Sequence, residues 1–89
     1  MGFFDSLFEK ALPHSIADLD YKVSTRNSTG FDTRSFEAKL NSIGKVAIRL
    51  EGSEKREAID GLRRLSENRN LDYHERMLLN DLLERLIRY

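Results

Sequence analysis

The C-terminal residues 72–89, DYHERMLLNDLLERLIRY, constrain the fold most, because no other segment combines such length with strong helical periodicity and dense aliphatic content. At about 100° per residue, one face about 180° wide collects the aliphatic side chains. These are Leu78, Leu79, Leu82, Leu83, Leu86 and Ile87. Because a helix with one neighbour needs an apolar stripe only about 100° wide, this core helix is expected to contact at least two others. They could come from its own chain or from a second copy.

Charged residues mark the start and the outer face of this helix. Asp72 and Glu75 have the spacing of a capping box, in which each side chain accepts a hydrogen bond from the other residue's backbone N–H. The outer face carries two acid-before-base pairs four residues apart, Asp81 with Arg85 and Glu84 with Arg88. Such pairs stabilise a helix by roughly 0.2–0.5 kcal/mol each, and they indicate a face exposed to solvent.

The composition narrows the classes of function. A chain of 89 residues allows one compact domain with a modest core. Its 15 basic and 15 acidic side chains cancel, which removes the long-range field that draws many small proteins to nucleic acid or anionic membrane. Because there is no cysteine, disulfides, thiolate metal sites and cysteine nucleophiles are excluded, and a reducing compartment, the cytoplasm, is expected. Neither a membrane span nor a signal peptide is recognisable.

The N-terminal residues 3–12, FFDSLFEKAL, form an amphipathic pattern that we expect to be a helical arm ending at Pro13. One half of the helical wheel collects Phe3, Phe4, Leu7, Phe8, Ala11 and Leu12. Two interpretations compete: an arm that docks on the body or on a partner protein, and an interfacial helix on a membrane. Membrane-surface helices usually carry basic residues on the polar face, whereas this one carries two acids and one lysine. The charge pattern favours docking.

The residues after the arm give weaker signals. Residues 21–25, YKVST, are rich in β-favouring types, and residues 26–30, RNSTG, have the composition of a loop. This loop is the best candidate for a hinge, so we divide the chain into an N-terminal amphipathic helix and hinge, 1–31, and a helical body, 32–89. A hinge at this point would permit exchange of the arm between two copies of the chain.

Residues 33–51 show helical spacing of apolar side chains, with Asp32 or Thr33 as the N-cap. The stripe consists of Phe36, Leu40, Ile43, Val46, Ala47 and Leu50. Gly44 opposes a helix, since it costs about 1 kcal/mol relative to alanine. Residues 45–50 also alternate like a strand, which leaves an α+β alternative with a two-stranded ribbon of 21–25 and 45–50. The continuous stripe favours the helix, because an isolated ribbon is marginally stable.

The next helix is expected to cover residues 54–68, after Gly52 ends the preceding helix and Ser53 provides an N-cap. Its apolar stripe, centred on Ala58, Leu62 and Leu65, is narrow. A short loop would join it to the core helix as an antiparallel pair. The predicted fold is therefore mostly α: a small helical bundle of three main helices plus the N-terminal amphipathic arm.

The two histidines are the first candidates for catalytic or metal-binding chemistry. His74 is near Asp72 and Glu75 in sequence, but adjacent helical positions point about 100° apart and do not converge on a metal. His14 has no sequence partner for acid–base or nucleophilic chemistry. No phosphate-binding loop, catalytic triad order or zinc spacing is present. We therefore expect no enzyme activity, no cofactor and no metal.

A basic group on residues 54–68 was considered as a nucleic-acid contact. It contains Lys55, Arg56, Arg63 and Arg64, followed by Arg69. Acidic residues interleave with it, and Asp60 is spaced to pair with Arg64, so little net field is expected. A DNA-binding helical regulator is therefore only the second alternative, after a peripheral membrane protein anchored by the N-terminal helix.

The favoured function is a small, non-enzymatic protein–protein interaction module that acts as a regulator, inhibitor or adaptor. Apolar side chains exceed what three short helices need to satisfy one another, so a homodimer is expected, and the other partner is a protein of unknown identity. The candidate interface comprises Phe3, Phe4, Leu7, Phe8, Ile48, Met77, Leu78, Leu82 and Tyr89.

Overall fold

The computed structural model describes the backbone of residues 3–88 and the side chains of residues 12–88. Its regular structure is entirely helical over that part of the chain. The helices are α1 (Phe3–Ser24), α2 (Arg26–Thr29), α3 (Thr33–Ala47), α4 (Gly52–Ser66) and α5 (Tyr73–Arg88). The α+β alternative is wrong, because residues 21–24 complete α1 and residues 45–47 complete α3. Both segments bury an apolar residue, Val23 and Ala47, as part of a helical stripe.

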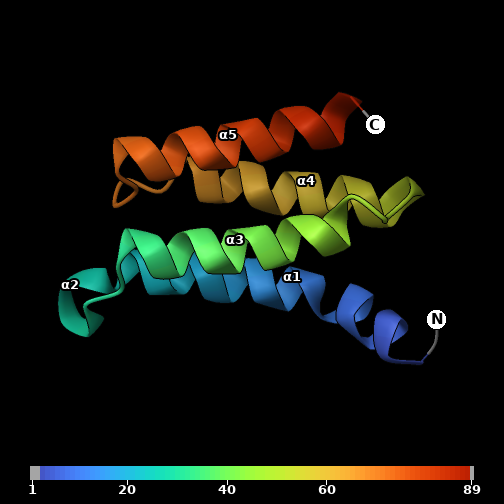
Figure 1. Ribbon diagram of the computed structural model, residues 1–89, viewed down its shortest axis with the longest axis horizontal. Helices are drawn as coiled ribbons and strands as arrows, with labels where there is room; N and C mark the ends of the chain where they lie inside the picture. Colours follow the sequence, from blue (N-terminus) through green and yellow to red (C-terminus); the bar gives the residue numbers. More distant parts are fainter. Residues whose placement is uncertain (1–2, 89) are drawn as a thin grey trace.

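The four long helices form a bundle (Figure 1). α1 packs against α3 and α4, and α5 packs against the same two helices, so α1 and α5 occupy opposite corners. α1 and α4 run in one direction, and α3 and α5 run in the other (Figure 1). The predicted mostly α-helical bundle is therefore confirmed, as is the antiparallel pair of α4 and α5. The three predicted main helices correspond to α3, α4 and α5, and the N-terminal segment provides a fourth long helix.

The largest departure from the sequence prediction concerns α1, which was expected to end at Pro13 but continues to Ser24. Beyond the proline, α1 contributes three buried side chains to the core, Ile16, Leu19 and Val23, which continue the stripe begun by Leu12. Burying side chains of this size contributes about 1.5–3 kcal/mol each. Together they outweigh the ~3 kcal/mol that a proline costs inside a helix. The division of the chain at residues 31/32 remains a prediction, although residues on both sides contribute to one core.

The predicted starts of α3 and α5 are confirmed by their hydrogen bonds. The Ser35 N–H donates to Oδ1 of Asp32 at 2.8 Å. In the capping box of α5, the Glu75 N–H donates to Oδ1 of Asp72 at 2.7 Å, and the Asp72 N–H donates to Oε1 of Glu75 at 3.0 Å. These bonds satisfy first-turn donors that the helix itself leaves free.

The junction between α3 and α4 differs from the prediction. α3 ends at Ala47 instead of running to residue 51, and Gly52 begins α4 rather than ending the helix before it. The Leu50 N–H donates to the Ala47 carbonyl at 3.1 Å, which tightens the turn after α3. Leu50 is buried, so the turn still adds an apolar side chain to the core.

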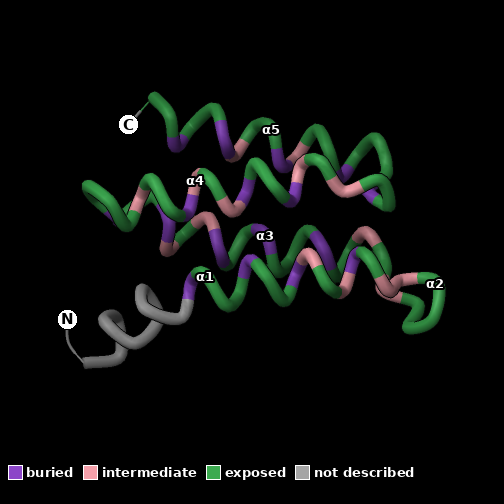
Figure 2. Tube along the Cα trace, turned by 180° about the vertical axis from the view of Figure 1, so that it is seen from behind, coloured by how far each residue is buried: buried purple, intermediate pink, exposed green. Residues whose placement is uncertain are grey.

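Buried side chains line the inward faces of the long helices, while the outward faces are exposed (Figure 2). On α5, the buried apolar residues are Leu79, Leu83 and Leu86, and Leu78 and Leu82 are partly buried. The prediction that this helix contacts two others is confirmed, since it packs against α3 and α4. Its apolar face is narrower than predicted, because Ile87 is 56% exposed.

Two glycines lie where helices approach closely. A Cβ atom on Gly44 would lie 3.1 Å from Cδ1 of Leu82, and one on Gly61 would lie 3.2 Å from Cγ2 of Ile16. Gly44 thus sits at the contact of α3 with α5, and Gly61 at that of α4 with α1. Because glycine has no side chain, the helices can pack closely at both positions. This packing offsets the cost of about 1 kcal/mol that glycine carries inside a helix.

Candidate interaction surface

Five large apolar side chains are exposed among the residues whose side chains the structure describes. They are Tyr21, Ile48, Tyr73, Met77 and Ile87. Tyr73 and Met77 are four residues apart on α5 and therefore share one face of that helix. Single exposed apolar residues are ordinary, but grouped ones mark candidate sites of association.

Ile48 and Ile87 belong to the same end of the bundle. α3 and α5 run in parallel, and the Gly44–Leu82 contact fixes their register. Ile48 and Ile87 each follow that contact by about one helical turn. We call this the apolar end, defined by Ile48 and Ile87. Leu12 of α1 lines a surface groove with Ile43 and Val46 of α3, so the N-terminal part of α1 leads to the same end.

The predicted interface residues fall into three groups. Ile48 and Met77 are exposed and available to a partner. Leu78 and Leu82 are partly buried against the core, so they offer less surface than the sequence pattern indicated. The other five lie outside the residues whose side chains are described: Phe3, Phe4, Leu7, Phe8 and Tyr89. The interface set as a whole remains a prediction.

The opposite end of the bundle is held by a buried ion pair. The guanidinium of Arg26 donates to both carboxylate oxygens of Glu75, at 2.8 and 2.6 Å, and to the Asn70 carbonyl at 2.8 Å. The Glu75 side chain is completely buried. A buried carboxylate is tolerated only when it is paired and hydrogen-bonded, and Arg26 together with the Asp72 N–H meets that need. Within the described chain, the buried Nε of Arg26 lacks an acceptor, which reduces the net benefit of the pair.

We call the Arg26–Glu75 ion pair and the hydrogen bonds around it the polar junction. Two asparagines in the loop between α4 and α5 extend it. The Asn68 side-chain amide donates to Oδ1 of Asp20 at 2.7 Å and to Oγ of Ser24 at 2.9 Å. The Asn70 side-chain amide donates to the Ser24 carbonyl at 3.0 Å. These hydrogen bonds link residues more than 40 positions apart in the sequence, so the polar junction joins the end of α1 to the start of α5.

The segment predicted as a loop and hinge, residues 26–30, is therefore different in the structure. Residues 26–29 form the single-turn helix α2, and Gly30 caps it in the left-handed conformation with φ +73°. The first residue of α2 is the arginine bonded to α5. Exchange of the N-terminal helix at this point would have to break the Arg26–Glu75 pair.

Two charged residues at the polar junction, Arg26 and Asp72, have shifted pKa values that fit a structural role. The hydrogen bond from Arg26 to Glu75 raises the pKa of the guanidinium, so Arg26 keeps its positive charge. The Glu75 backbone N–H and the Thr33 hydroxyl lower the pKa of Asp72 below its usual 3.8. Among residues 12–88, no group of three histidine, aspartate or glutamate side chains could hold a metal ion. His74 instead lies 3.9 Å from Glu37 on α3.

The lowered pKa of Asp72 predicts a dependence of stability on pH. Its ionised form stabilises the folded chain fully above the unfolded pKa, near 3.8, and this contribution is lost as the pH falls through the folded pKa. We expect Asp72→Asn to weaken the loss of unfolding free energy on acidification, because asparagine still caps the helix but does not titrate. Urea unfolding followed by circular dichroism between about pH 6 and pH 2 measures the slope.

The control for this experiment is Asp81→Asn, which removes one carboxylate from the solvent face of α5 outside any cap. It reports the general effect of removing one negative charge. If Asp72→Asn and the unchanged chain lost stability equally on acidification, the cap would not carry the pH dependence.

Comparison of the chain with known protein families, curated proteins and solved structures finds no match. Over the described residues, no helix is both long enough and apolar enough to cross a membrane. The exposed apolar side chains are thus the features on which a functional proposal can be built.

Proposed function

We propose that this chain is a small, non-enzymatic interaction module that forms a homodimer and acts as a regulator, inhibitor or adaptor of another protein. The observation that carries the proposal is the exposure of Ile48 and Ile87 at the apolar end, to which the N-terminal part of α1 leads. Residues 3–11, with three phenylalanines, directly precede Leu12 in that helix. The absence of cysteine fits action in a reducing compartment such as the cytoplasm.

The apolar area available approaches that of a specific dimer interface. A phenylalanine buries about 150–250 Å² when it is fully covered, so three would supply roughly 450–750 Å². A standard interface buries about 800 Å² on each partner. The phenylalanines together with Ile48 and Ile87 would approach that area, and aromatic residues are enriched in the desolvated centre of interfaces.

Size-exclusion chromatography with light scattering tests the proposal. We expect the mass of a dimer for the unchanged chain and of a monomer for Ile48→Asp, Ile87→Asp. Both positions are exposed, so the variant should keep its fold, as a thermal melt would verify. Tyr21→Asp is the matched control, since Tyr21 is also exposed but lies near the other end of α1. A monomer at high micromolar concentration of the unchanged chain would refute the homodimer.

A further inference from the structure

α4 and the C-terminal part of α5 frame a shallow groove of about 470 Å³. Its apolar lining is Ile59, Leu86 and the exposed Ile87. Basic side chains surround this lining: Lys55, Arg56 and Arg63. We call this site the basic groove. On α4, Lys55, Ile59 and Arg63 follow one another at intervals of four residues, so a cation lies one turn to either side of the isoleucine.

The cations of the basic groove have no partner within the described part of the chain. The side chains of Lys55, Arg56 and Arg63 form no hydrogen bond or ion pair there, whereas Arg85 and Arg88 on the outer face of α5 pair with nearby acids. The one acid in the groove, Asp60, was expected from the sequence to pair with Arg64. That prediction is wrong, because the described residues show no such ion pair. The groove therefore has three cations against one carboxylate.

Two other grooves among the described residues have a different charge. The groove between α1 and α4, of about 340 Å³, combines Asp20, Glu57 and Asp60 with a single cation, Arg64. The groove between α1 and α3, of about 330 Å³, has one acid, Asp18, and one base, Lys39. An acidic, apolar segment would thus be repelled by the first, whereas the charges of the second cancel and give no net attraction. Of the three, the basic groove suits such a segment best.

We infer that the basic groove of one copy of the chain receives residues 3–11 of a second copy. This inference rests on the proposed homodimer and names the surface that forms it. Residues 3–11 provide three phenylalanines for the apolar lining, and Asp5 and Glu9, four residues apart, for the cations. Lys10 is the one base in the segment. Opposite charges on the rim of an interface steer association and fix its register.

The position of the groove also fits a symmetric dimer. The basic groove includes Ile87 of the apolar end, to which the N-terminal part of α1 leads. Segment and groove therefore belong to the same end of each copy. A twofold axis beside that end would create two equal contacts, each with the segment of one copy in the groove of the other, as an isologous dimer requires.

Charge reversal tests the inference. We expect Lys55→Glu, Arg63→Glu to raise the dissociation constant of the dimer by about tenfold or more per reversal, measured by light scattering over a dilution series. The matched control is Lys45→Glu, Arg69→Glu, which makes the same change in net charge at exposed positions outside the groove. This control should dimerise like the unchanged chain, and circular dichroism melts verify that both variants fold.

A charge swap identifies the segment that occupies the groove. We expect Asp5→Lys, Glu9→Lys to weaken the dimer as the groove variant does. An equimolar mixture of the two variants should form a heterodimer, because both contacts then pair opposite charges. A groove variant that dimerises like the unchanged chain would overturn the groove but leave the homodimer standing. A mixture that stays monomeric would overturn residues 3–11 as the occupant, and an unchanged chain that is monomeric would overturn both proposals.

Discussion

Replacement of Arg26 by methionine is expected to lower the free energy of unfolding by about 3–5 kcal/mol, the range observed when one partner of a buried ion pair is removed. Methionine fills much of the space of the arginine but donates no hydrogen bond. The carboxylate of Glu75 would then stay buried, with the Asp72 N–H as its remaining donor in the described contacts. Urea denaturation followed by circular dichroism, with a linear extrapolation to water, measures the loss.

The double variant Arg26→Met, Glu75→Met separates loss of the pair from the burial of an unpaired charge. It should recover much of the lost stability, because two apolar side chains of similar size often replace a buried ion pair at little cost. Arg26→Lys should lie between the unchanged chain and Arg26→Met, since an ammonium cannot donate to both carboxylate oxygens in the same fixed geometry. A loss below about 1 kcal/mol for Arg26→Met would mean that the pair does not hold this end of the bundle.

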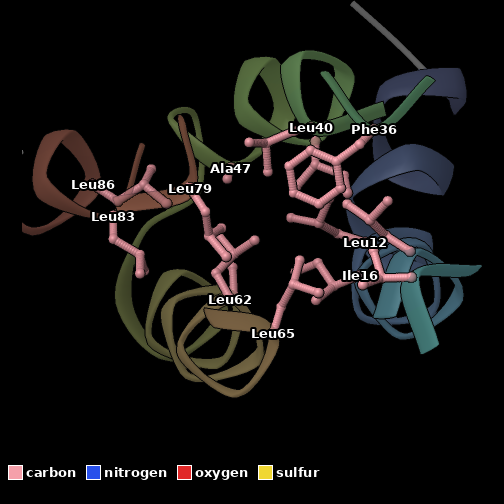
Figure 3. Close-up of a cluster of buried hydrophobic side chains, with 14 of the residues drawn as sticks. Leu12, Ile16, Phe36, Leu40, Ala47, Leu62, Leu65, Leu79, Leu83 and Leu86 are labelled. Carbon is pink, nitrogen blue, oxygen red and sulfur yellow. The ribbon is translucent and has the colours of Figure 1, made fainter. Parts of the chain in front are cut away.

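Phe36→Ala is expected to destabilise the fold by about 3–5 kcal/mol, because it leaves a cavity in addition to removing apolar contact. Phe36 is completely buried and belongs to the hydrophobic core that α3 shares with α1, part of which Figure 3 shows. Denaturation in urea measures the change. Tyr73→Ala is the control, because Tyr73 is 79% exposed and its removal should change stability by less than about 0.5 kcal/mol. Similar losses for the two variants would contradict the core assigned to α1 and α3.

Local sequence signals predicted the body of the bundle well. The capping box of Asp72 and Glu75 and the cap by Asp32 gave two helix starts within about one residue, because these side chains bond to backbone groups only a few positions away. The apolar stripe of residues 33–51 also predicted a helix correctly, although Gly44 disfavours helical structure. The structure supplies the reason for the glycine, which is the close approach of Leu82 from α5.

The features that were missed depend on distant partners. The sequence predicts a helix that ends at Pro13, because the local cost of proline is visible in the sequence while the neighbours that cover α1 are not. The spacing of Leu12, Ile16, Leu19 and Val23 was nevertheless present as a helical stripe. Weighing it against the proline would have predicted the longer helix.

The Arg26–Glu75 pair joins residues 49 positions apart, so no local pattern could supply the arginine. The position of Glu75 in the sequence does give a signal of the pair. Glu75 precedes Leu79 by four residues and therefore lies on the face of α5 that is otherwise apolar. A carboxylate at such a position indicates a buried cationic partner, even where the partner itself cannot be named.

The two ends of the bundle differ in what must break when the native protein opens locally. At the polar junction, opening would separate a bidentate ion pair and several amide hydrogen bonds in one event. At the apolar end, the described residues meet through side-chain packing around a short turn, so smaller openings can occur without rupture of such a network. Among the described residues, local opening would therefore be expected to begin at the apolar end and to diminish toward the polar junction.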